Sequence, residues 1–160
     1  MKNKWKDVDM LETVITRFVN DRTQQNYFDL LDVLKDSYIW VPCTAVMSEA
    51  DQRRFMELLD NNDDITGLEF VAQDETRLIP DILQSGDDYF FPIFSSVEAM
   101  GEYGENFSHI ERSFMEAINL ARNNNKKPVA IVLNAFTNPI EISMELCNIV
   151  EKMVLENNLN

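Results

Sequence analysis

Two adjacent serines beside a glutamate are the first residues in this sequence with the chemistry of a reactive site. The run at 88–100 reads DYFFPIFSSVEAM, so an apolar stretch ends at Ser95 and Ser96, just before Glu98. A serine activated by a neighbouring base is a nucleophile. The alternative is structural, because Ser95 and Glu98 have capping-box spacing, which predicts that a strand ends and a helix begins at Ser95. We favour the structural interpretation.

The other nucleophiles, bases and metal ligands do not form a recognised catalytic set. His109 is the only histidine, so a Ser-His or Cys-His mechanism would have to use it. The sequence has no G-x-S-x-G, G-x-G-x-x-G or Walker motif. Cys43 is a conceivable nucleophile, but a cysteine at the end of a strand is more often a small buried hydrophobe. With Cys147, only three Cys and His ligands exist for zinc, so we expect no metal, no cofactor and no catalytic residue.

The acidic cluster at 60–64 invites comparison with a calcium-binding loop. Asn62 and Asp64 occupy positions where an EF-hand loop, counted from Asp60, carries its oxygen ligands. The glycine and the final glutamate that this loop requires are replaced by Ile65 and Val71. The cluster is therefore predicted to be a polar turn.

Size and composition predict one soluble domain. The chain has 160 residues, of which 45% are hydrophobic, enough for a single core. No apolar run approaches the roughly 18 residues of a membrane helix, and the first residues do not resemble a signal peptide. Two cysteines far apart in sequence predict no disulfide framework. We therefore expect a cytoplasmic protein with reduced thiols and no membrane partner.

The negative charge is concentrated in the middle of the chain. A formal net charge of -14 argues against nucleic acid and anionic membranes as general partners. Between Glu49 and Glu105, fifteen acids stand against Arg53, Arg54 and Arg77, a net charge of -12. This excess predicts either a solvated face or the attraction of a basic protein partner.

Capping residues and hydrophobic periodicity predict the elements. Helices are predicted to begin near six capping residues: Asp9, Thr23, Ser48, Ser95, Ser108 and Ser143. Strands are predicted at 38–41, 77–83, 89–94 and 129–133. Residues 84–87 supply the turn of a hairpin, and 134–139 form a loop. The final helix carries an apolar stripe: Leu146, Ile149, Val150 and Met153.

This alternation of helices and strands predicts a single α/β domain over residues 1–160, with α+β as the alternative. We expect a mixed sheet of four to five strands packed with helices. The side chains of Phe91, Ala130 and Val132 should be buried, and residues 1–8 should be flexible.

The order of these motifs resembles one protein family. YIWVPCT, then YFFPIFSSVEA with a following helix, then VAIVLN with Asn-Pro and a terminal helix, are similar to the N-terminal domain of the SseB family. The resemblance covers residues 24–155, and its motifs indicate the fold more than a function. Because the family is named for enhanced serine sensitivity, the resemblance implies a link to amino-acid stress and no particular reaction.

Two classes of function follow. The first is a non-catalytic binding or regulatory module, whose contact residues would be aromatic side chains predicted in loops: Tyr103, Phe107 and Phe136. The second is a small-molecule-binding protein or weak enzyme, with a site where strands meet loops: Cys43, Thr44, Ser95, Asn134 and Asn138. A shallow aromatic surface would favour the first class, and a deep pocket the second. We expect the first, with a basic protein partner anchored by Tyr103 or Phe107.

Overall fold

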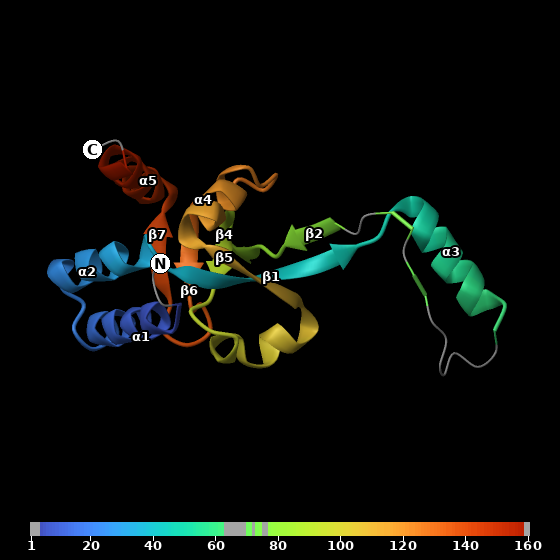
Figure 1. Ribbon diagram of the computed structural model, residues 1–160, viewed down its shortest axis with the longest axis horizontal. Coiled ribbons are helices and arrows are strands. Elements are labelled where there is room, and N and C mark those ends of the chain that lie inside the picture. The colour runs from blue at the N-terminus through green and yellow to red at the C-terminus, as the bar shows by residue number, and fades with distance from the viewer. Residues whose placement is uncertain (1–3, 63–69, 72, 75–76, 159–160) are drawn as a thin grey trace.

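The computed structural model describes residues 4–62, 70–71, 73–74 and 77–158 of the chain. They form an α/β fold, as predicted (Figure 1). In chain order the elements are α1 (Lys4–Asn20), α2 (Gln24–Leu34), β1 (Tyr38–Val46), α3 (Glu49–Asp60), β2 (Arg77–Pro80), β3 (Leu83–Ser85), β4 (Asp88–Ile93), the 3₁₀ segment η1 (Glu98–Asn106), β5 (Ser108–Ser113), α4 (Phe114–Arg122), β6 (Ala130–Leu133), β7 (Ile140–Ser143) and α5 (Met144–Asn158).

The strands form two sheets that meet at one pair of residues. One sheet has the order β2-β1-β5 and the other the order β3-β4-β6-β7. The pair β4 and β6 is parallel, and the other neighbours are antiparallel. Trp40 and Phe94 exchange backbone hydrogen bonds of 2.8 and 2.9 Å, which link β1 to the chain just after β4. The predicted mixed sheet is therefore present as sheets of three and four strands joined by this bridge.

The segment predicted as one strand at 77–83 is two strands. Its first part, β2, pairs with β1 and ends at Pro80, which lies on an edge strand as the proline predicts. The amide of Asp81 then donates to the carbonyl of Pro42 at 2.9 Å, and the chain moves on to pair with β4 as β3. The predicted hairpin turn is confirmed between β3 and β4, where Gly86 has a φ of 60°.

The main core lies on one face of the strands, where alternate side chains are buried. These side chains are Ile39, Val41, Cys43, Phe91, Ile93, Ile131, Leu133, Ile140 and Ile142. Helices α1, α2, α4 and α5 contribute apolar residues to the same cluster. The predicted burial of Phe91, Ala130 and Val132 is confirmed, at 0%, 1% and 8% exposure. Because β6 is buried on both faces, its sequence is continuously apolar rather than alternating.

The predicted helix starts are partly right. Thr23, Ser48 and Ser143 each accept a hydrogen bond from the amide three residues later, at 3.1 Å in every case. The start predicted at Asp9 is wrong, because α1 already begins at Lys4. Of the first eight residues, expected to be flexible, residues 4–8 belong to α1, and 1–3 lie outside the described residues.

The helix start predicted at Ser108 is also wrong. Ser108 opens β5, which pairs with β1 over six residues and so gains a ladder of main-chain hydrogen bonds. Helix α4 begins after Ser113, whose hydroxyl accepts from the amide of Glu116 at 3.2 Å. Capping-box spacing occurs at both serines, and pairing with β1 decides which one caps the helix. Strand β7 was not predicted, because its four residues directly precede the final helix.

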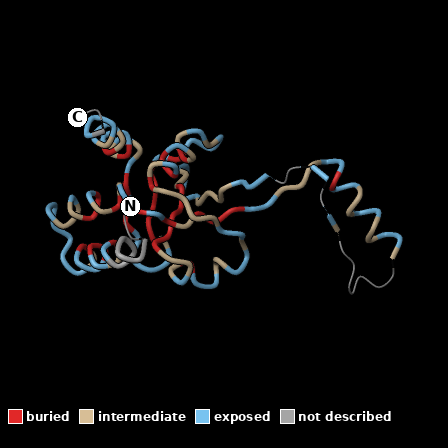
Figure 2. Tube along the Cα trace, viewed as in Figure 1, coloured by how far each residue is buried: buried red, intermediate tan, exposed pale blue. Residues whose placement is uncertain are grey.

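Part of the chain extends away from the main core. The second half of β1 and strand β2 lead out to α3, which lies far from the other helices (Figure 1). We call residues 44–80, as far as they are described, the arm, and the rest of the described residues the body. Buried residues gather in the body, whereas the arm is mostly exposed or intermediate (Figure 2).

Candidate binding surface at the carboxyl ends of the parallel strands

The carboxyl ends of β4 and β6 lie side by side, because these two strands are parallel and in register. Ser95 follows the first strand and Asn134 the second, and both are buried at 5% exposure. Asn134 Oδ1 accepts from the amide of Ser95 at 3.0 Å, and Asn134 Nδ2 donates to Ser95 Oγ at 3.1 Å. The structure thus brings together two of the predicted site residues as a buried hydrogen-bonded pair.

The Ser95–Asn134 pair fixes the backbone where the strands end. Asn134 has a positive φ of 55°, a conformation that asparagine tolerates better than most residues. Its amide donates to the carbonyl of Ile93 at 2.9 Å, and its carbonyl accepts from the amide of Thr137 at 3.2 Å. The polar groups of both side chains are therefore used in holding two loops together.

The predicted capping role of Ser95 is wrong, and its neighbour performs it. Ser96 Oγ accepts from the amide of Ala99 at 3.1 Å, just where η1 begins. Ser95 is unsuitable as a cap because its hydroxyl is already bonded to Asn134 across the strand ends. The two adjacent serines therefore have different roles. Ser95 links the end of β4 to the loop after β6, and Ser96 binds the backbone where η1 begins.

Four aromatic rings gather beside this pair. Tyr103 is central, with its ring centroid 4.7 Å from those of both Phe107 and Phe136. The ring of Phe94 lies 6.2 Å from Tyr103 and stacks on Phe136 at 6.0 Å. We call these four residues the aromatic cluster. The three predicted contact aromatics are therefore brought together, although they come from η1, the residue after it and the loop after β6.

Exposure differs sharply within the aromatic cluster. Phe94 is fully buried, Tyr103 and Phe107 are intermediate, and Phe136 is 51% exposed. The hydroxyl oxygen of Tyr103 is buried and has no hydrogen-bond partner among the described residues. A buried hydroxyl without a partner costs free energy, so it marks a position where an added acceptor or donor would be stabilising.

Three carboxylates lie on the segment that carries Tyr103. Glu98, Glu102 and Glu105 belong to η1, and all three are exposed. Within the described part of the chain, none of them takes part in an ion pair. The same short segment therefore contributes one aromatic ring, whose face has a negative potential, and three carboxylates without an ion-pair partner.

Of the remaining predicted site residues, Cys43 and Thr44 do not belong to this surface, whereas Asn138 lies next to it in the chain. Cys43 is completely buried in the main core, and burial raises the pKa of its thiol. Thr44 is exposed where the arm begins and pairs with Ile79 of β2. Asn138 is exposed in the loop that also holds Phe136. Sequence reasoning missed Phe94, although alternation from the buried Phe91 and Ile93 places it on the opposite face.

Metal ligands and membrane-spanning helices are two further features that could define a site. No group of three or more His, Cys, Asp and Glu side chains there is arranged to hold a metal ion. Asp63, Asp64 and Ile65, which bear on the calcium comparison, lie outside the described residues. No helix in the described ranges combines the length and apolarity needed to cross a membrane.

Comparison with known proteins gives one match. The family model described as the SseB protein N-terminal domain matches residues 11–146, from α1 into α5, and so includes the whole aromatic cluster. No curated protein and no solved structure matches the chain. Since the match covers most of the sequence and agrees with the resemblance found at 24–155, this chain belongs to the SseB N-terminal domain family.

Proposed function

We propose that this protein is a non-catalytic, cytoplasmic binding module that recognises a basic segment of a protein partner. The observation that carries the proposal is the aromatic cluster, in which Phe136 is half exposed and Tyr103 comes from η1, the segment that also carries three unpaired glutamates. An arginine or lysine side chain of the partner would lie on Phe136 and Tyr103 and face Glu102 or Glu105. Cation–π contact and carboxylate attraction then act on the same group.

The state of the polar groups favours binding over catalysis. A weak enzyme at this edge would need a side chain free to act on its substrate. Ser95 and Asn134, the two predicted site residues that directly follow the strands, are buried and hydrogen-bonded to each other. A small-molecule site would need an open hollow, whereas the rings of Tyr103, Phe107 and Phe136 occupy the adjacent space at centroid distances of 4.7 Å.

The charge of the chain supports a basic partner in particular. Within the acidic region from Glu49 to Glu105, the carboxylates of Glu98, Glu102 and Glu105 lie on η1, whereas those of α3 lie in the arm, far from the other helices (Figure 1). The field of the η1 carboxylates extends over about a Debye length, roughly 8 Å at physiological salt, and acts mainly on the association rate. Nucleic acid and anionic membranes would be repelled by the same charge, so this proposal assigns neither as a partner.

A peptide pair tests the proposal. The probes are a synthetic arginine-rich peptide and the same sequence with glutamate in place of arginine, with binding followed by surface plasmon resonance at several salt concentrations. We expect binding of the arginine peptide only, with an association rate that falls as salt rises. Phe136→Ser should speed dissociation, whereas the double change Glu102→Gln and Glu105→Gln should slow association.

A charge-matched control separates the site from overall charge. The double change Glu145→Gln and Glu156→Gln removes two exposed carboxylates from α5, outside the acidic region, and should leave the association rate nearly unchanged. Equal binding of the two peptides would show that this surface is not the site. So would binding rates that neither Phe136→Ser nor the double change on η1 alters.

A further inference from the structure

A second surface lies on helices α2 and α5, away from the aromatic cluster. The two helices border a groove of about 510 Å³, lined by Phe28, Asp29, Leu31, Asp32, Lys35, Leu146, Ile149, Val150 and Met153. Its floor belongs to the main core, because Leu31 and Val150 are buried in the cluster beneath the helices. The aromatic cluster lies on the other face of the strands, as shown by Phe94, which alternates with the core residue Ile93.

The walls of the groove are more apolar than solvent-exposed helix faces usually are. Phe28 is 48% exposed, Ile149 50% and Met153 52%. Of the predicted apolar residues of the final helix, Leu146, Ile149, Val150 and Met153, only Val150 is buried. The stripe is therefore shared between the core, which Leu146 and Val150 contact, and the groove, where Ile149 and Met153 remain about half exposed.

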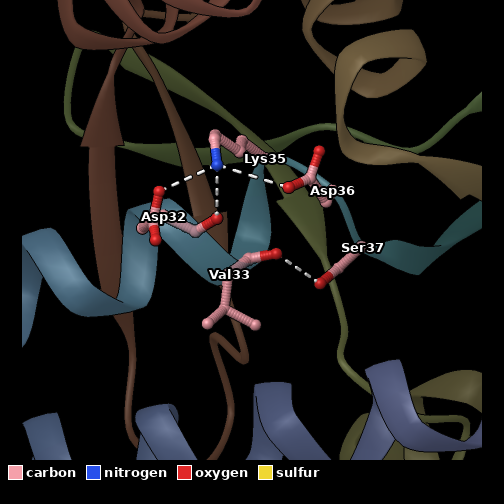
Figure 3. A network of polar contacts seen from close by, with 5 residues as sticks. All are labelled: Asp32, Val33, Lys35, Asp36 and Ser37. Atoms are coloured by element: carbon pink, nitrogen blue, oxygen red, sulfur yellow. Dashed lines mark hydrogen bonds and ion pairs between the residues drawn. The ribbon is translucent and has the colours of Figure 1, made fainter. Parts of the chain in front are cut away.

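The polar rim of the groove is negative. At the end of α2, Lys35 Nζ donates to the carbonyl of Asp32 at 3.1 Å, to Asp32 Oδ1 at 2.8 Å and to Asp36 Oδ2 at 3.3 Å (Figure 3). Its three donors are thus already used within the chain, and the carboxylates outnumber it. Asp29, one turn earlier, accepts from the side-chain Nε2 of Gln25 at 2.9 Å. The rim therefore attracts cations and has no spare cation for an anionic ligand.

We propose that this groove binds an amphipathic helix of a partner protein, with apolar residues facing the groove and basic residues on its flanks. Two neighbouring helices with open apolar sides form a channel in which a third helix fits by ridge-and-groove packing. The basic flanks would face Asp29 and Asp32. A second copy of this chain is a poorer occupant, because a net charge of -14 repels itself and would bring two acidic rims together.

The test uses a designed peptide as its probe. It is a helical peptide of about 15 residues, long enough for a helix to form on binding, with leucines at helical spacing and lysines on both flanks. A second peptide carries glutamates in place of the lysines. Fluorescence anisotropy should detect binding of the lysine peptide, with affinity at least about tenfold lower for the glutamate peptide, a difference that one lost favourable contact pair can produce.

Matched variants locate the site. Ile149→Glu should weaken binding of the lysine peptide by at least about tenfold, a typical cost of losing an apolar anchor. Leu155→Glu is the control, since it makes the same change on the same helix at a side chain that is 58% exposed and does not line the groove. Circular dichroism should show that both variants fold, because neither position is buried. Phe136→Ser should not affect this peptide, so failure here is distinguishable from failure at the aromatic cluster.

Three results would overturn the proposal. They are equal binding of the two peptides, equal effects of Ile149→Glu and Leu155→Glu, and a concentration-dependent dimer in light scattering that Ile149→Glu abolishes. The last result would assign the groove to a second copy of the chain.

Discussion

In the body, helices and strands share a continuous apolar core, whereas in the arm a single buried carboxylate organises the described contacts. Asp51 on α3 is 1% exposed, and its two oxygens accept from the amides of Gln73 and Asp74 at 3.0 and 2.9 Å. Arg54 donates to the same carboxylate at 3.0 Å. We therefore expect that removal of apolar volume from the core unfolds the body, whereas removal of the charge of Asp51 opens the arm and leaves the body folded.

The arm has only a small apolar contribution of its own. The rings of Phe55 and Phe70 meet edge to face at 5.3 Å, and the guanidinium of Arg54 lies 5.3 Å from the centre of Phe70. Met56 remains 56% exposed and Val71 75% exposed. The position of Gln73 and Asp74 beside α3 therefore depends mainly on their hydrogen bonds to Asp51.

The largest effect is expected in the centre of the body. Phe91→Ala removes a completely buried ring, so it should lower the free energy of unfolding by about 3 to 5 kcal/mol. Urea denaturation followed by circular dichroism measures this. Phe28→Ala makes the same change at a ring that is 48% exposed and should cost less than about 1.5 kcal/mol. Similar losses in the free energy of unfolding for Phe91→Ala and Phe28→Ala would mean that the core is not centred on β4.

The next effect should be confined to the arm. Asp51→Asn removes the negative charge and leaves one carbonyl oxygen for two amides, so the amides of Gln73 and Asp74 should exchange with solvent much faster. Hydrogen exchange read by mass spectrometry or NMR tests this. The urea midpoint of the body should stay unchanged in Asp51→Asn. A fall in this midpoint as large as that caused by Phe91→Ala would show that the arm and the body do not unfold independently. Glu49→Gln is the control, because its side chain is 91% exposed.

The same carboxylate should make the arm sensitive to acid. The amides of Gln73 and Asp74 and the guanidinium of Arg54 hold the pKa of Asp51 below its usual range. Because the folded arm favours the carboxylate, its stabilisation is complete above the ordinary pKa of aspartate and is lost as pH falls through the lowered pKa. The exchange protection of Gln73 should therefore decline in acid. This pH dependence should be absent in Asp51→Asn, and its persistence there would point to another group.

The two regions also differed in how well the sequence predicted them. In the body, the strand at β6 and the burial of Phe91, Ala130 and Val132 followed from apolar runs that only a shared core explains. In the arm, the capping by Ser48 was predictable because it is local. The burial of Asp51 was not predictable, since the two amides that its carboxylate binds lie more than twenty positions away and leave no periodic pattern.

The candidate surface shows the same limit. The sequence singled out Tyr103, Phe107 and Phe136 as candidate contact aromatics in loops, but Tyr103 lies on η1, and its contact with Phe136 depends on which strands are parallel. Likewise, the hydrogen bonds between Ser95 and Asn134 span 39 positions, so local capping rules assigned the wrong role to Ser95. Spacing in the sequence therefore singled out these residues but did not identify the residues that they contact in the fold.

The thiols offer a probe of the body alone. Burial raises the pKa of Cys147 to about 12 and also raises that of Cys43, so neither is a reactive thiolate near neutral pH. Iodoacetamide should modify the folded protein slowly and the urea-denatured protein quickly, as judged by intact mass. Phe91→Ala should accelerate modification, whereas Asp51→Asn should not. Fast labelling of the native protein would show that the core opens locally around a cysteine.

The smallest effects are expected for surface ion pairs, where the two regions should again differ. In the body, Arg122 on α4 donates to both oxygens of Glu151, at 2.9 and 3.4 Å, and to Asn148 at 2.7 Å, thereby linking α4 to α5. In the arm, Arg53 and Glu49 approach only to 3.8 Å, with both side chains largely exposed.

Arg122→Ala should therefore lower the free energy of unfolding by about 1 kcal/mol, and Arg53→Ala by less than about 0.3 kcal/mol. A double-mutant cycle of Arg122→Ala with Glu151→Ala isolates the contribution of the pair, and its coupling should shrink as salt rises. Equal costs for the two arginine changes would mean that the bidentate contact adds nothing to the packing of α4 on α5.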